Sequence, residues 1–164
     1  MNAKTIVGIL VGVLAFFGAK YAVKHFMSSG DELPENIRNN PAYAEAVDAI
    51  EKDQDKLSQA ESVEEALKIT EGSLKNTLPI QVDEYTRLVD VKAGPGKLFT
   101  YEYTLSGLGE ITAEQLEEAM RPELEKQYNG PGMRAFKRGK VVALYRYNDV
   151  DGNLITEIRI GPKE

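Results

Sequence analysis

The chain has 164 residues, a formal net charge of −6 and no cysteine. The lack of cysteine excludes disulfides, thiolate metal sites and cysteine nucleophiles. The single histidine, His25, lies next to an apolar N-terminal segment, so the rest of the chain has no imidazole for a catalytic triad or a histidine metal cluster. The length beyond that segment suits one domain with its own core.

An unbroken apolar run occupies residues 5–19, with Lys4 before it and Lys20 after it. If the Lys20 side chain snorkels, the run extends over residues 5–23 and reaches about 28 Å as a helix, enough to cross a bilayer core. We therefore predict a single transmembrane anchor at residues 1–26, in contact with membrane lipid. A cleaved signal peptide is the alternative, although its possible cleavage sites fit poorly, and a buried core helix comes third.

Small residues recur on one face of this segment, at the i, i+4, i+7 and i+11 spacing of a helix. Such a face would let another helix approach closely, which allows a homo-oligomer through the anchor. The alternative is that glycine and alanine are simply common in membrane helices. The residues are Gly8, Gly12, Ala15 and Ala19.

Two further regions follow the anchor. Residues 27–40 are rich in Ser, Gly, Asn, Pro and acidic residues, and predict a flexible tether. Beyond residue 26 the chain carries 17 basic and 26 acidic residues, a formal charge of −9. This acidity argues against nucleic acid and favours a neutral or basic protein partner for the domain, residues 41–164.

Helical periodicity and capping signals predict three main helices in the domain. The first begins at Pro41. Ser62 and Glu65 form a capping box that opens the second, which ends before Pro79. The third has a kink or break at Pro122, and a short helical turn follows Pro131. The apolar face of the first helix is Tyr43, Val47, Ile50, Gln54 and Leu57, and the third opens with the capping box Thr112 and Gln115.

Four strands are predicted by alternation with a period of two. Residues 88–93 and 97–105 form one hairpin, and residues 141–148 and 154–160 form another around Asp151-Gly152. The predicted fold class is α+β: after the transmembrane helix come two helices and a small, largely antiparallel four-stranded sheet, in the order hairpin, helix, hairpin. The strand order stays open.

Two short stretches resemble chemical motifs but lack the required residues. GPGK at residues 94–97 has neither the first glycine of a phosphate loop nor its metal-binding hydroxyl, because these positions hold Val91 and Leu98. The DVDG stretch at residues 149–152 lacks the first and last carboxylates of a calcium loop. We predict no metal, no cofactor and no enzymatic activity, although paired carboxylates could still act if a cleft brought them together. The candidates are Asp83, Glu84, Asp90, Glu102, Glu110 and Glu157.

Tyrosines form the densest side-chain pattern, at i and i+2 on two predicted strands. Tyrosines so placed usually form cross-strand pairs over a core. The functional alternative is an aromatic face for contact with a protein or ligand. The residues are Tyr101, Tyr103, Tyr145 and Tyr147.

The domain contains four segments of note: LPIQVDEYTRL, AGPGKLFTYEYTL, MRPELEKQY and YRYNDVDGNLITEI. Together they resemble a recurrent family of small bacterial envelope proteins of unknown function. The resemblance covers roughly residues 62–164 and implies a bacterial source and an exported domain, without supplying catalytic residues. Relatives often have a cysteine after the RPELEKQY motif and another near the C-terminus, and this chain has neither.

These features favour a membrane-anchored protein-binding or accessory module of the bacterial cell envelope, in the style of an inhibitor or immunity protein. The predicted location is the inner membrane, single-pass, with the domain on the periplasmic side. A small-molecule sensor, or an enzyme that uses carboxylates, is the alternative. A pilin-like subunit comes third, because the apolar segment lacks the early glutamate of such subunits.

Overall fold

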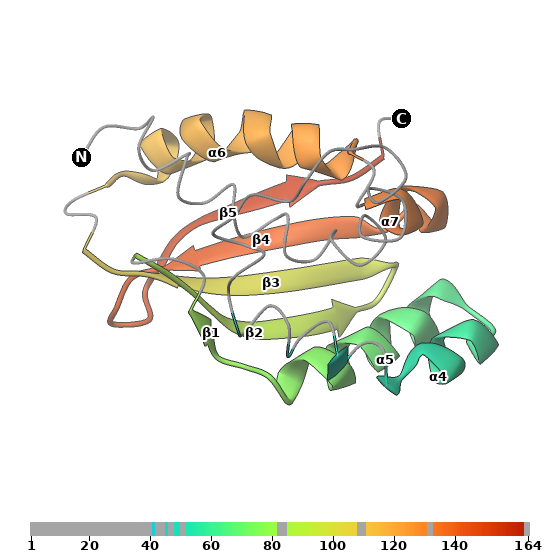
Figure 1. Ribbon diagram of the computed structural model, residues 1–164. Helices are drawn as coiled ribbons and strands as arrows, with labels where there is room; N and C mark the ends of the chain where they lie inside the picture. The colour runs from blue at the N-terminus through green and yellow to red at the C-terminus, as the bar shows by residue number, and fades with distance from the viewer. Residues whose placement is uncertain are drawn as a thin grey trace.

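The computed structural model of the protein shows a five-stranded mixed sheet with helices packed against one of its faces (Figure 1). The strands lie in the order β1-β2-β3-β4-β5, which is also their order in the chain. The central pair, β3 and β4, is parallel, and the other neighbouring pairs are antiparallel. The structure describes residues 41, 45, 48, 49, 52–81, 85–107, 111–130 and 133–162.

The strands form the middle of the molecule, and the described helices lie at its flanks (Figure 1). The helices are α4 (Gln54–Gln59), α5 (Val63–Lys75), α6 (Ala113–Tyr128) and α7 (Arg134–Gly139). The strands are β1 (Ile80–Gln81), β2 (Thr86–Gly94), β3 (Leu98–Leu105), β4 (Val142–Asn148) and β5 (Leu154–Ile160).

The predicted sheet of four strands is wrong, because a fifth strand, β1, pairs with β2. β1 has only two residues, directly after Pro79, and is too short to show a period of two. The sheet is also mixed. The chain leaves β3, forms α6 and α7, and returns to start β4 at the same end of the sheet, which makes the two strands parallel.

The predicted fold class also included a transmembrane helix, and this part of it is corrected. Among the described helices, none is long and apolar enough to cross a membrane. The predicted anchor at residues 1–26, its small residues and the tether at residues 27–40 lie outside the described residues. Part of the predicted first helix lies outside them as well; the structure describes α4 and a few helical residues before it.

The predicted capping box at Thr112 is complete, whereas the one at Ser62 forms only one of its two bonds, because Glu65 Oε2 accepts from the Glu61 N–H at 2.8 Å instead. The Glu65 backbone N–H donates to Ser62 Oγ at 3.1 Å. At α6, Gln115 N–H donates to Thr112 Oγ1 at 3.2 Å, and Thr112 N–H donates to Gln115 Oε1 at 3.0 Å. These bonds satisfy backbone donors that the first turn of a helix leaves unpaired, and so fix where α5 and α6 begin.

α6 continues through Pro122, where the sequence predicted a kink or break. Pro122 is exposed, so the missing N–H lies on the side away from the core. The inward side is completely buried and holds the helix against the sheet. It consists of Leu116, Met120, Leu124 and Tyr128.

The core lies between one face of the sheet and the helices. Alternate residues of β3 to β5 are buried, whereas β2 carries a bulge at Val89 that shifts its alternation by one residue. Leu154, at the start of β5, is 48% exposed. The buried strand residues are Ile80, Thr86, Leu88, Val91, Phe99, Tyr101, Tyr103, Leu105, Ala143, Tyr145, Tyr147, Asn148, Thr156, Ile158 and Ile160.

Replacing Pro122 by alanine tests whether packing alone carries the helix through this residue. Pro122→Ala should raise the free energy of unfolding by about 1–2 kcal/mol, because alanine restores a backbone donor and removes the ring clash. Urea unfolding of the full chain measures it. Glu118→Ala, also exposed on α6, is the control and should change stability by less than about 0.5 kcal/mol. A less stable Pro122→Ala protein would contradict this account.

Candidate interaction surface

Among the described elements, no helix packs against the sheet face opposite α5, α6 and α7. α5, α6 and α7 all contribute side chains to the core on the other face, and the remaining residues of the strands alternate onto this one. We call it the open face. Its members are mostly polar and half-buried or exposed: Arg87, Asp90, Lys92, Leu98, Thr100, Glu102, Thr104, Val142, Leu144, Arg146, Ile155, Glu157 and Arg159.

Four charged residues form a row straight across the open face. Asp90 of β2 lies opposite Glu102 of β3, Glu102 lies opposite Arg146 of β4, and Arg146 lies opposite Glu157 of β5. We call these four residues the charged row. They line a shallow depression of about 200 Å³ together with Lys92, Thr100 and Leu144.

Not all charges of the row are neutralised within the sheet. Arg146 Nε lies 2.8 Å from Glu157 Oε1 as an ion pair. Asp90 Oδ1 accepts from the Val91 backbone N–H at 2.9 Å and lies 3.8 Å from Lys75 Nζ of α5. Asp90 is therefore drawn toward its own strand and the sheet edge.

Glu102 is the exception. Its Oε1 accepts from Asn148 Nδ2 at 2.9 Å, and Asn148 is only 6% exposed, so the carboxylate is held by a neutral, fixed group. Within the described part of the chain Glu102 has no ion pair. Like charges directly opposite on neighbouring strands are unfavourable, and Asp90 stands opposite Glu102. A cationic group from outside would relieve this repulsion.

The four predicted tyrosines come together on the other face, in the core. Tyr101 stacks on Tyr145 with ring centroids 5.3 Å apart and 15° between the planes, and Tyr103 stacks on Tyr147 at 5.3 Å and 18°. None is more than 2% exposed. The cross-strand packing interpretation is therefore confirmed, whereas a protein contact through the same rings stays a prediction.

Burial dominates the ionisation of these rings. Removal from water raises the pKa of Tyr101, Tyr103, Tyr145 and Tyr147 well above 10, and neighbouring phenols add to the shift. Tyr128 of α6 donates from its hydroxyl to the Val141 carbonyl at 2.7 Å, and burial raises its pKa as well. The core thus holds five phenols in their neutral form.

A second depression lies between α4 and the C-terminal end of α5. Among its lining residues, the buried Ser73 hydroxyl donates to Asp53 Oδ2 at 2.6 Å, and Asp53 also forms an ion pair with Lys56. The hydrogen bond from Lys56, followed by that from Ser73, lowers the pKa of the Asp53 carboxyl. These contacts join α4 to α5, so a structural role accounts for the charged groups here.

The predicted carboxylates divide into two sets. Asp90, Glu102 and Glu157 lie in the charged row. Among the described residues, no group of three acidic or histidine side chains could hold a metal ion. Arg146 was missed, although strand alternation places it on the face opposite the tyrosines. The remaining candidates, Asp83, Glu84 and Glu110, lie outside the described residues.

No protein-family model and no curated protein matches the chain. A similar solved structure is the 1.60 Å crystal structure of a "putative secreted protein" from Pseudomonas aeruginosa. It is 10% identical, with a TM-score of 0.47, and the match covers 60% of this chain and 88% of that one. A likeness at this level assigns no function.

The buried phenols predict alkaline behaviour. Above pH 10 the unfolded chain releases phenolic protons that the folded chain retains, since burial raises the pKa of these groups. The free energy of unfolding should therefore fall as the pH rises, by about 1.4 kcal/mol per pH unit for each such tyrosine. Denaturant unfolding at several alkaline pH values measures the slope.

An absorbance titration of tyrosinate provides a direct check. Of the eight tyrosines in the chain, the four stacked ones should stay protonated until the protein unfolds. Tyr147→Phe should lessen the slope of stability against pH by the contribution of one tyrosine. Ionisation of all eight near pH 10 in the folded protein would show that the stacked rings are open to solvent.

Proposed function

We propose that the chain is a non-catalytic protein-binding module whose open face docks a protein partner through a basic side chain. The observation that carries this proposal is the Asp90 and Glu102 pair. Two carboxylates lie opposite each other on neighbouring strands, and Glu102 has no ion pair within the described residues, since Arg146 beside it is paired with Glu157. A lysine or arginine of the partner would fit beside Glu102 and offset the repulsion.

The shape of the open face supports a protein rather than a small molecule. Small-molecule sites are usually concave and about 300–1,000 Å³ in volume. The depression at the charged row measures about 200 Å³ and is shallow. A broad face of half-buried polar side chains with a few apolar ones, such as Leu144, is closer to a protein interface.

The finer function and location extend the same proposal. Inhibition of a basic protein, as by an immunity-type protein, suits the charge of −9 beyond residue 26. The resemblance to bacterial envelope proteins supports an extracytoplasmic position of the domain. Both the inhibitory function and the extracytoplasmic position depend on which protein is the partner, and the experiment below identifies that protein.

A photo-crosslinking amino acid at Thr100, beside the charged row, tests the proposal in cells that express the full chain. A single protein adduct is expected from this position, because the probe would lie within the interface. The matched control carries the probe at Glu118, exposed on α6. The same adducts from both positions, or none from Thr100, would contradict docking on the open face.

Charge reversal at Glu102 then tests the electrostatic basis. Glu102→Lys should reduce the Thr100 adduct about tenfold or more, because a lysine there repels the basic group of the partner. Glu118→Lys makes the same charge change elsewhere and should leave the adduct nearly unchanged. Equal loss in both variants would mean that only overall charge matters.

A further inference from the structure

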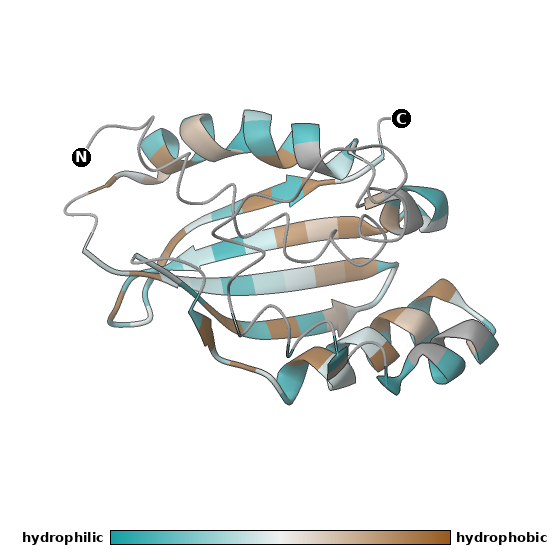
Figure 2. Cartoon of the chain, viewed as in Figure 1, coloured by the Kyte–Doolittle hydropathy of each residue, from teal (hydrophilic) through white to brown (hydrophobic). Residues whose placement is uncertain are grey.

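Lys92 brings a positive charge into the depression that also contains the charged row. It follows Asp90 by two residues on β2 and lies opposite Thr100 of β3, which makes Glu102 its diagonal neighbour. Figure 2 shows how hydrophilic residues alternate with hydrophobic ones along β2. Lys92 is exposed, so its ammonium group is available at the surface of the open face.

The acids next to Lys92 are engaged by another lysine. Lys75 Nζ of α5 lies 2.6 Å from Glu71 Oε1 and 3.8 Å from Asp90 Oδ1. Glu71 Oε2 also accepts from the Ala93 backbone N–H at 3.0 Å. Both carboxylates are thus held at the β2 edge, and among the described residues Lys92 forms no ion pair.

Lys92 and Glu102 do not form an ion pair with each other either. The Cα atoms of diagonal neighbours on antiparallel strands lie about 7–8 Å apart. The Glu102 carboxylate is also hydrogen-bonded to Asn148 of β4, at 2.9 Å. The open face therefore presents an unpaired cation and an unpaired anion side by side. Such a pair is complementary to a surface on which an acid and a base are neighbours.

We propose that the protein docked on the open face carries an acidic side chain beside its basic one, with the acid at Lys92 and the base at Glu102. This inference rests on the proposed function, because it assumes docking on this face. The required spacing is close to that of residues one helical turn apart, about 5–6 Å, or of alternate residues on a strand, about 7 Å. Two contacts of opposite sign would also fix the orientation of the partner.

Lys92 thereby discriminates between two kinds of basic partner. A partner with clustered bases would place a second cation near Lys92 and be repelled by it. A partner with an acid beside its base is attracted at both positions. Loss of the Lys92 charge should therefore strengthen the binding of a purely basic surface and weaken the binding of an acid–base pair.

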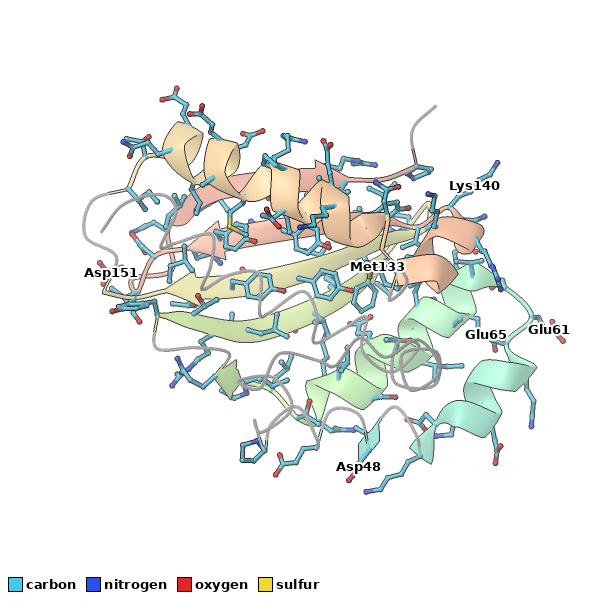
Figure 3. The ribbon with its side chains drawn as sticks, turned by 45° about the horizontal axis from the view of Figure 1, so that its top comes forward. Asp48, Glu61, Glu65, Met133, Lys140 and Asp151 are labelled. Atoms are coloured by element: carbon cyan, nitrogen blue, oxygen red, sulfur yellow. The ribbon has the colours of Figure 1, made fainter. Side chains whose placement is uncertain are left out.

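Charge reversal at Lys92 decides between these partners, with the yield of the Thr100 photo-adduct of the full chain as the readout. Lys92→Glu should lower the yield about tenfold and Lys92→Gln about threefold, because each removes the attraction for the partner's acid. Lys92→Arg keeps the charge and should retain most of the yield. The matched control is Lys140→Glu, at an exposed lysine beside α7, which should leave the yield nearly unchanged (Figure 3).

A yield that rises or stays constant in Lys92→Glu would overturn the inference and leave docking on the open face intact, since the partner would then offer only bases. An equal loss in Lys140→Glu would also overturn it, because overall charge would explain both results. Lys92→Gln adds no acid to the face and so separates loss of the contact from loss of the fold. No adduct from the chain that carries the probe alone would contradict docking itself, and the inference with it.

Discussion

The parallel pairing of β3 with β4 is the contact on which both faces of the protein depend. Its register sets Tyr101 opposite Tyr145 and Tyr103 opposite Tyr147, and the same register sets Glu102 opposite Arg146. Because side chains alternate between faces, a slip of one residue would move the tyrosines to the open face and the charges into the core. The cost of burying those charges, together with the stacking of the rings, therefore specifies the register.

Local structure could be predicted from the sequence, and the central pairing could not. The helix caps at Ser62 and Thr112, and the alternation that buries Phe99 to Leu105, depend on residues a few positions apart. β3 and β4 are separated by 36 residues, and nothing in their own patterns favours each other over another strand. Because the sequence does not show that pairing, it offered the three acids of the row only as separate candidate site residues and did not offer Arg146 at all.

Both long edges of the sheet are contacted by helix side chains. At the β2 edge Glu71 Oε2 accepts from the Ala93 N–H at 3.0 Å, where β1 has already ended. At the other edge Arg121 Nη1 donates to the Arg159 carbonyl at 3.4 Å. Groups that would pair with an added strand are thus engaged from within. A partner is accordingly better accommodated on the open face than by extending the sheet.

The acidity of the domain is not located on the face that we assign to docking. The open face carries three acids, Asp90, Glu102 and Glu157, against four bases, Arg87, Lys92, Arg146 and Arg159. α6, in contrast, has five glutamates against one arginine and one lysine.

This separation assigns different tasks to the two sets of charges. The field of the helices attracts a basic protein over distances of about one Debye length, which affects the rate of encounter and weakens with salt. At contact, the nearly balanced open face gives no general preference for a basic surface. Selection of the partner therefore has to come from the position of its cation. A cation beside Glu102 is favoured, whereas one placed a strand further along would be repelled by Arg146, which is already paired with Glu157. An acidic protein that bound only through net charge would have no such requirement for register.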